Sequence, residues 1–323
     1  MSNTLTTDLA GSAIEPSDSV KEPNQPRYRS RFGGFWPDLS NGMEIVKAKL
    51  DQGVISAVEA QQLHHWITKG YVIIENAVPH DVIDRLLSDT ELAWKGHYPS
   101  IFVEHFVNGR IKFSPACPEL RMALGKLLDI YAVSEAARET IFAQPIHRFL
   151  DLIFQEPSMA FQSLSFMAGS GQPIHQDTAY VVVSSPMQFA ASWIALEDIQ
   201  PNTGELEYYE GSHEFEEFLW EGKYKSMPPG SPDHERFLAS LHEQAARMGL
   251  ARKKFRPKKG DALIWSADLA HGGSKERDPE TSRLSLVTHY CPARLEPGYF
   301  QSGRHSAKLA HDKDSFYTCA IHQ

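Results

Sequence analysis

Two histidines and one aspartate in the second half of the chain have the types and spacing of a metal site. His175 and Asp177 stand two residues apart in GQPIHQDTAY, and His271 follows the apolar run ALIW much further along. Residues i and i+2 of a strand face the same side, so His175 and Asp177 would reach one ion. Two imidazoles and a carboxylate are the facial ligand set of non-haem Fe(II). Two alternatives to an iron site stay open. The spacing could be accidental, because the chain has 15 histidines, or the ion could be zinc, which accepts the same ligands.

A cation and a hydroxyl follow the last of these histidines. Arg283 opens the run RLSLVTHY, and strand alternation puts Arg283 and Ser285 on one face. A guanidinium presents a planar fork that matches a carboxylate. Beside a metal, the pair predicts an anchor for the far carboxylate of a dicarboxylate, whereas Arg283 taken alone would be read as a surface salt bridge.

Four further histidines are interpreted differently. His64 and His65 fall on a helical stretch and are expected to form a solvated or packed helix face. His213, in the turn EGSH, is expected to be structural. His289 shares strand parity with Arg283, so it would either reach the pocket or be a hydrogen-bonded core residue.

Short β-rich runs must position these residues. From about residue 160 such runs alternate with turn clusters, for example PNTGE and KKGD, which is typical of a sandwich or barrel. The predicted strands are 161–169, 179–185, 187–196, 205–210, 261–267 and 283–291. One stretch interrupts them at about 214–251, acidic at first and then helical over 233–249.

The first half is predicted to be mainly helical. Ser56 and Glu59 form a capping box before an apolar helical face that Gly70 ends. Apolar spacing predicts one strand over 70–78 and further helices over 81–94, 119–131 and 146–155. Residues 1–35 are rich in Ser, Thr, Pro and charge and are expected to be a flexible arm. The aromatic residues of RYRSRFGGFWPD would cover a core edge or tie this arm to the body.

Composition narrows the class of partner. The 323 residues are 41% hydrophobic and carry a net charge of −9 without a long basic run. This favours a globular protein with a small-molecule substrate and disfavours nucleic acid or an anionic membrane. Three scattered cysteines indicate neither disulfides nor a thiolate zinc site. The start lacks a basic and apolar leader and no run would span a bilayer, so a cytoplasmic protein is expected.

Taken in order, these segments resemble the phytanoyl-CoA dioxygenase family of Fe(II)- and 2-oxoglutarate-dependent oxygenases. The likeness begins with GYVIIENAVPHDVIDRLL, continues through IHQDTAY and SWIALEDIQPNTGELEYYEGSH, and ends with KKGDALIWSADLAHGGS and SRLSLVTHY. It implies a single mainly β domain over residues 36–323, with flanking helices around a double-stranded β-helix, the jelly-roll or cupin-like core.

The resemblance also implies roles for the residues. His175, Asp177 and His271 would hold the iron, and Arg283, assisted by Ser285, would bind the remote carboxylate of 2-oxoglutarate. Further candidates for lining the cosubstrate pocket are Gln162, Gln176, Thr178 and Trp193. With O2 as co-reactant, the implied reaction is hydroxylation of a small metabolite with release of succinate and CO2; desaturation, cyclisation or epimerisation stays open. Asp177 argues against halogenation, because the related halogenases have a small residue there.

Several alternatives stay open. The insertion at about 214–251 is longer than the link usual in the family and predicts a lid, a homo-oligomer contact or a plain surface insertion. No basic pocket for coenzyme A is readable, so an acyl-CoA substrate is not favoured. A binding protein without turnover would bury a charged cluster at a cost and for no purpose. In a zinc hydrolase with the same ligands, Arg283 and Ser285 would have no task.

Overall fold

The protein is described by a computed structural model that covers residues 25–322 apart from 109, 123–124, 279 and 300–304. The expected arm over 1–35 therefore lies mostly outside the described residues. Its described end is fixed to the body, because the Phe35 and Phe154 rings stack with centroids 4.8 Å apart. Trp36 Nε1 also donates to the Leu152 carbonyl at 2.8 Å.

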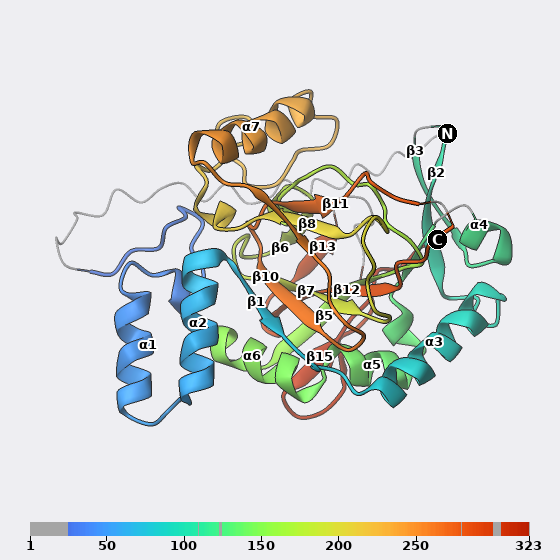
Figure 1. Ribbon diagram of the computed structural model, residues 1–323, viewed down its shortest axis with the longest axis horizontal. Coiled ribbons are helices and arrows are strands. Elements are labelled where there is room, and N and C mark those ends of the chain that lie inside the picture. Colours follow the sequence, from blue (N-terminus) through green and yellow to red (C-terminus); the bar gives the residue numbers. More distant parts are fainter. Residues whose placement is uncertain (1–24, 109, 123–124, 279, 300–304, 323) are drawn as a thin grey trace, which may run out of the picture.

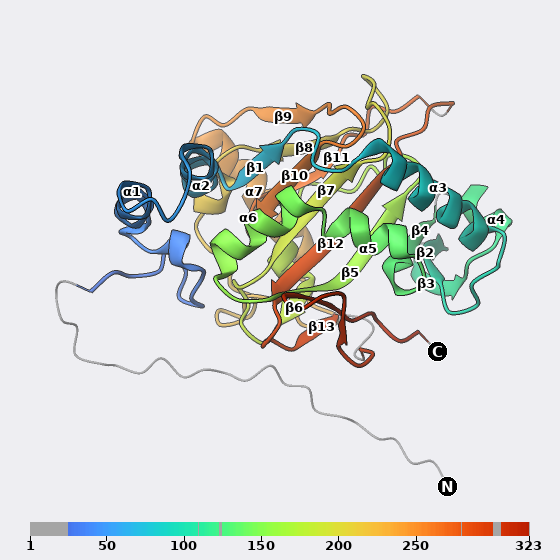
Figure 2. The same ribbon diagram turned by 90° about the horizontal axis from the view of Figure 1, so that it is seen from below.

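Two sheets and a strand pair form the framework (Figures 1 and 2). The larger sheet has the order β1 (Tyr71–Ile74), β10 (Ala262–Ser266), β7 (Ala190–Ala195), β12 (Ser285–Pro292), β5 (Ser158–Phe166), β4 (Lys126–Leu128), β2 (Phe102–Val107) and β3 (Arg110–Pro115), with β15 (Ser315–Tyr317) beside β5 and β14 (Leu309–Ala310) beside β15. The smaller sheet is β11 (His271–Gly273), β8 (Leu206–Tyr209) and β9 (Arg252–Phe255), and β13 (Pro297–Tyr299) pairs with β6 (Val181–Val183). Strands distant in sequence alternate as neighbours, which is the winding of a jelly roll and confirms the predicted mainly β, double-stranded β-helix core.

Strand alternation gives the larger sheet two different faces. On β7 and β10, Ile194 and Ile264 belong to the core cluster that includes the helices. Trp193 and Trp265 point the other way and pack in an inner cluster with Tyr208 of β8. This inner face, between the two sheets, is where the site residues gather.

Helices cover the outside of the framework. Figure 1 shows α5 and α6 on the opposite side of the strands from α7, and α1 beside α2 at one end. The helices are α1 (Gly42–Asp51), α2 (Ala57–Lys69), α3 (His80–Trp94), α4 (Pro118–Met122), α5 (Glu135–Ile141), α6 (Gln144–Phe154) and α7 (His234–Arg247), with 3-10 turns η1 (Trp36–Asp38), η2 (Ile130–Ala132), η3 (Asp177–Ala179) and η4 (Ser212–Glu214). The capping box of Ser56 and Glu59 is present, and Gly70 ends α2 in the left-handed conformation at φ +82°, both as predicted.

The helix predicted over 119–131 is wrong. That stretch holds the short helix α4, strand β4 and the turn η2. A Cβ at Gly125 would lie 2.2 Å from Val103 Cγ1, and Leu127 pairs with both Val103 and Ser165. Sheet pairing therefore overrides the helical spacing of this segment. The β2–β3 hairpin, which alternates only weakly in burial, was not predicted.

The insertion packs against the β framework. Within 214–251, Phe237 and Leu241 of α7 lie in a buried cluster with Trp220, Phe215 and Tyr209. Within the described part of the chain, none of the helices has the length and apolar character to cross a membrane.

Candidate active site

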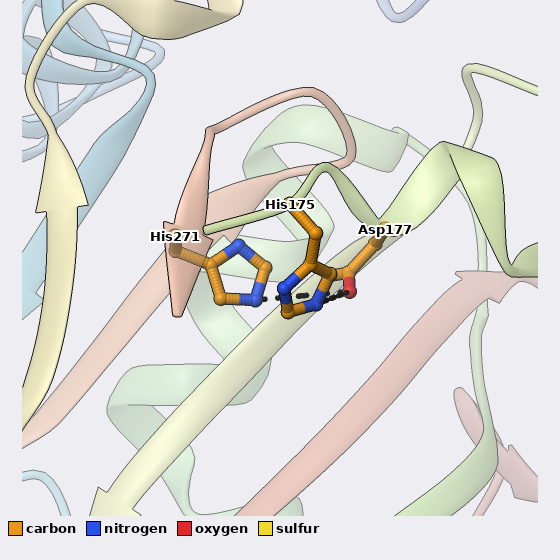
Figure 3. A group of neighbouring side chains, drawn as sticks. All are labelled: His175, Asp177 and His271. Carbon is orange, nitrogen blue, oxygen red and sulfur yellow. Dashed lines mark ion pairs between the residues drawn. The ribbon is translucent and has the colours of Figure 1, made fainter. Parts of the chain in front are cut away.

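A pair of backbone hydrogen bonds brings His175 and His271 together. His175 N donates to the His271 carbonyl at 2.8 Å, and His271 N donates back to the His175 carbonyl at 2.9 Å. Asp177 is the first residue of η3, so the stretch from His175 to Asp177 is not the regular strand that the sequence suggests. The turn nevertheless directs the Asp177 carboxylate toward both imidazoles (Figure 3).

Three potential ligand atoms converge at this point. His175 Nε2 and His271 Nε2 lie 3.6 and 3.7 Å from Asp177 Oδ1, and all three residues are buried. Each imidazole has its Nδ1 2.9 Å from a backbone carbonyl, of Pro173 and Leu269 respectively. An Nδ1–H that donates to a carbonyl leaves Nε2 with its lone pair, as a metal-bound histidine requires. The three residues could therefore hold a metal ion.

Burial and neighbouring groups set the protonation of these side chains. Burial lowers the pKa of His271 to about 4, so its imidazole is neutral at pH 7. Burial acts to raise the pKa of Asp177, but His271, His289 and a hydrogen bond with His175 outweigh it and hold that pKa well below its usual value. Trp265 Nε1 also donates to Asp177 Oδ2 at 2.8 Å. A neutral imidazole and an ionised carboxylate are the forms that bind metals.

A cavity of about 620 Å³ joins the three residues to Arg283. Arg283 is only 2% exposed, and its guanidinium carbon lies 5.1 and 5.5 Å from the ring centroids of Phe166 and Trp193. Its Nη2 donates to the Ala168 carbonyl at 3.4 Å, and its Nε has no hydrogen-bond partner within the described residues. Burial lowers the pKa of Arg283 to about 10, which still leaves it charged at pH 7. A buried guanidinium whose hydrogen bonds are incompletely satisfied is costly, so this end of the cavity is suited to an anion.

A profile of the family described as phytanoyl-CoA dioxygenase (PhyH) matches residues 66–283, about two thirds of the chain and a range that includes all four of these residues. The chain belongs to this family. It is therefore a 2-oxoglutarate-dependent non-haem iron enzyme, with Fe(II), 2-oxoglutarate and O2 as its cofactor and co-reactants, as the resemblance implied.

Solved structures of iron- and 2-oxoglutarate-dependent enzymes share the fold of this family member. The epimerase SnoN of nogalamycin biosynthesis has a TM-score of 0.53 at 15% identity, over 80% of this chain and 98% of that one. The carbocyclase SnoK of nogalamycin biosynthesis has a TM-score of 0.55 at 14% identity, over 77% and 89%. EctD from S. alaskensis, solved with 2-oxoglutarate and 5-hydroxyectoine, has a TM-score of 0.51 at 17% identity, over 74% and 76%. At these identities the likeness shows the fold alone, and a search of curated proteins found no match.

Of the five other residues expected to contact the cosubstrate, two line the cavity and three do not. Gln162 and Trp193 line the cavity of this dioxygenase-family protein. Ser285 is fully buried at the start of β12, and its Oγ has no hydrogen-bond partner among the described residues. Thr178 and Gln176 lie behind the ligand segment, because both side chains donate to Asp268 and neither lines the cavity.

The four histidines interpreted separately in the sequence lie in positions that agree with those interpretations. His289 lines the cavity, with its Nε2 3.4 Å from Asp177 Oδ2, so of its two interpretations the structure favours the pocket. His213 Nε2 lies 3.0 Å from the Ile67 carbonyl, away from the cavity lining, in a structural position. His64 is exposed and His65 half-buried on α2.

Trp265 was missed by the sequence analysis. The available signal was strand alternation: in the run 261–267 it shares a face with Leu263, immediately before the segment that carries His271. A tryptophan in an apolar strand is most simply interpreted as packing, and only the fold shows its N–H directed at Asp177.

Proposed function

We propose that this protein hydroxylates a small molecule, with iron held by His175, Asp177 and His271 and with 2-oxoglutarate anchored by Arg283, releasing succinate and CO2. One observation carries the proposal: the buried Arg283, whose Nε has no hydrogen-bond partner among the described residues, opens on the same cavity as the three ligand residues. A dicarboxylate between them would pair its far end with the guanidinium and present its other end to the metal.

The chain's own residues fit this arrangement. When bound, the iron supplies the activation of O2 that drives the oxidation. Phe166 and Trp193 pack on the guanidinium and keep water from it. The Ser285 hydroxyl, two residues from Arg283, has no hydrogen-bond partner among the described residues. We propose that it assists in holding the same carboxylate, with Gln162 on the neighbouring strand.

The rest of the cavity indicates a substrate with an apolar body. Its wall is mostly apolar and includes Phe106, Ile111, Phe113, Leu128, Leu164, Val181, Met227 and Leu238. Of the described lining residues, the only lysine or arginine besides Arg283 is Lys126, which is paired with Glu104 at 2.8 Å. Free cations for the phosphates of a coenzyme A ester are thus lacking in the described lining, so a small metabolite is the better candidate.

The insertion contributes to the wall of the cavity. Met227, His234 and Leu238 from 214–251 line it, and His234 Nε2 lies 2.7 Å from the Tyr180 hydroxyl. We propose that this segment selects the substrate by closing over it.

The test is an anaerobic Fe(II) titration with and without 2-oxoglutarate, followed by the weak visible metal-to-ligand charge-transfer band of the chelate. We expect the band in the wild type and its loss in Asp177→Ala. A wild type that binds Zn(II) tightly and gives no band would favour the zinc hydrolase, and one that binds neither metal would favour the binding protein.

A further inference from the structure

The insertion carries a lysine that is withdrawn from solvent. Lys225 is 5% exposed. Its Nζ donates to Asp268 Oδ2 at 2.7 Å and lies 3.5 Å from Glu217 Oε1. An ammonium is expensive to bury unless it is paired and hydrogen-bonded, and Asp268, itself 6% exposed, is its close partner.

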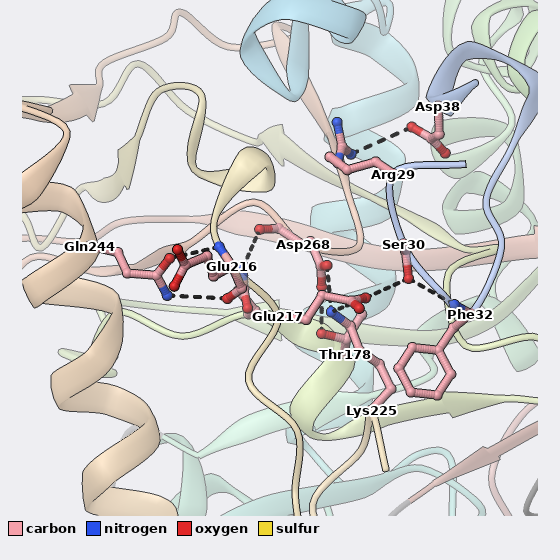
Figure 4. Close-up of polar contacts among 11 residues, drawn as sticks. Arg29, Ser30, Phe32, Asp38, Thr178, Glu216, Glu217, Lys225, Gln244 and Asp268 are labelled. Atoms are coloured by element: carbon pink, nitrogen blue, oxygen red, sulfur yellow. Dashed lines mark hydrogen bonds and ion pairs between the residues drawn. The ribbon is translucent and has the colours of Figure 1, made fainter. Parts of the chain in front are cut away.

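Asp268 connects the two segments that carry the proposed iron ligands. Thr178 Oγ1 donates to Asp268 Oδ1 at 2.6 Å, and Gln176 Nε2 donates to the Asp268 carbonyl at 2.7 Å. Gln176 and Thr178 flank Asp177 in the sequence, and Asp268 precedes His271 by three residues. In Figure 4 the Asp268 carboxylate lies between the Thr178 hydroxyl and the lysine ammonium.

The backbone around Lys225 is itself fixed. Met227 N donates to the carbonyl of Ala179, the last residue of η3, at 2.9 Å. On the other side, Glu217 Oε1 accepts a hydrogen bond from Ser30 Oγ at 2.5 Å. The Gln244 side chain of α7 bonds both the N–H and the carbonyl of Glu216, at 2.7 and 3.2 Å (Figure 4). Lys225 is therefore held in place by neighbours on both sides in sequence.

We propose that Lys225 is a positioning residue for the iron site. Through Asp268 it fixes the turn that carries Asp177 relative to the segment that carries His271. The inference rests on the proposed iron-binding role of these residues. Without the ammonium, the buried Asp268 carboxylate would keep only the Thr178 hydroxyl as a hydrogen-bond donor among the described residues, so water would enter or the turn would move. Groups that orient metal ligands typically contribute 10- to 100-fold in metal affinity.

Isothermal titration with Mn(II), an air-stable substitute for Fe(II), tests the proposal on the full-length protein. We expect Lys225→Met to weaken Mn(II) binding about 10- to 100-fold. The control is Lys223→Met, which removes an exposed lysine two residues away and should leave the affinity unchanged. The double variant Lys225→Met with Asp268→Asn removes the uncompensated charge and keeps an acceptor for Thr178, so its affinity should return to within a few-fold of the wild type.

The outcomes separate this inference from the proposed function. Lys225→Met with a lowered melting temperature but wild-type Mn(II) affinity would overturn it, since Lys225 would then serve the fold alone. A double variant as weak as the single one would also overturn it. If Lys225→Met does not fold, Thr178→Val removes the other hydrogen bond to Asp268, and an unchanged Mn(II) affinity in that variant decides against the proposal. A wild type that binds no Mn(II) would instead count against the proposed function.

Discussion

The two ends of the cavity are built in opposite ways. At the metal end the side chains are already oriented: His175 and His271 are each fixed through Nδ1 by a backbone carbonyl, and Asp177 accepts the Trp265 N–H. At the far end Arg283 is equally buried, but within the described residues its Nε has no hydrogen-bond partner.

The metal end is preorganised for its ligand, whereas the Arg283 end holds a buried charge that only a bound ligand satisfies. Side chains fixed by hydrogen bonds before the metal arrives lose little freedom on binding it, which favours affinity. A buried charge that is satisfied only by a ligand costs stability until the ligand binds. The metal end should therefore weaken when a supporting hydrogen bond is removed, whereas the other end should bind less but fold no worse when its charge is removed.

The largest expected effect follows from replacing Arg283 by methionine. Removing one partner of a buried charge pair typically costs about 2–5 kcal/mol of binding, which is at least about 30-fold in the Kd of 2-oxoglutarate. The ligand-free protein should be as stable as the wild type or more so, because an unpaired buried cation has been replaced by an apolar chain of similar length. Calorimetry with 2-oxoglutarate and Mn(II), together with urea denaturation of the ligand-free protein, measures both quantities.

A matched control for this variant is Arg148→Met. Arg148 is half exposed and is paired with Glu59 at 2.6 Å, outside the cavity lining. It should leave the Kd of 2-oxoglutarate unchanged. A clear loss of ligand-free stability in Arg283→Met would contradict the contrast between the two ends, because Arg283 would then be contributing to the fold.

A smaller effect is expected from Trp265→Phe. The change keeps an aromatic ring in the inner cluster but removes the 2.8 Å hydrogen bond to Asp177, so metal affinity should fall about 10- to 100-fold. Trp94→Phe is the comparison, because Trp94 is equally buried and its Nε1 has no hydrogen-bond partner among the described residues. Equal Mn(II) affinities for the two variants would show that the Trp265 N–H does not orient Asp177.

Local patterns in the sequence predicted the residues that gather at the two ends of the cavity and several of the core strands around them. His175, Asp177 and His271 converge although the first two are not on a regular strand, since the backbone bridge between the two histidines does the positioning. Arg283 precedes β12 on an apolar strand pattern that is visible in sequence. Period-2 alternation and turn residues thus predicted β1, β5, β6, β7, β8, β10 and β12, but not the β2–β3 hairpin or β4.

Contacts between distant segments could not be predicted in this way. Lys225 and Asp268 are 43 residues apart, and nothing in the sequence around either distinguishes a buried pair from two surface charges. Residues 119–131 show the same limit, because the spacing of their apolar residues suits a helix until β5 offers a strand partner. Thr178 was expected to line the pocket, but in η3 its side chain turns toward Asp268 and only the preceding residue, Asp177, faces the cavity.

The smallest expected change is in the pH dependence of stability, which compares His271 with a histidine outside the cavity lining. Burial lowers the pKa of both His271 and His213 to about 4. The unfolded chain takes up a proton at each near pH 6.5, so the stability that each contributes is full above that pH and is lost as the pH falls toward 4. Between pH 7 and 5.5 each histidine should cost the metal-free protein about 1 kcal/mol of unfolding free energy.

His213→Gln should remove about that much of the pH dependence, measured by urea denaturation, and leave Mn(II) affinity unchanged. His271→Gln should remove as much and also weaken Mn(II) binding severely. If both variants kept the wild-type slope, neither histidine would be buried in the neutral form, and the protonation assigned to the metal end would be wrong.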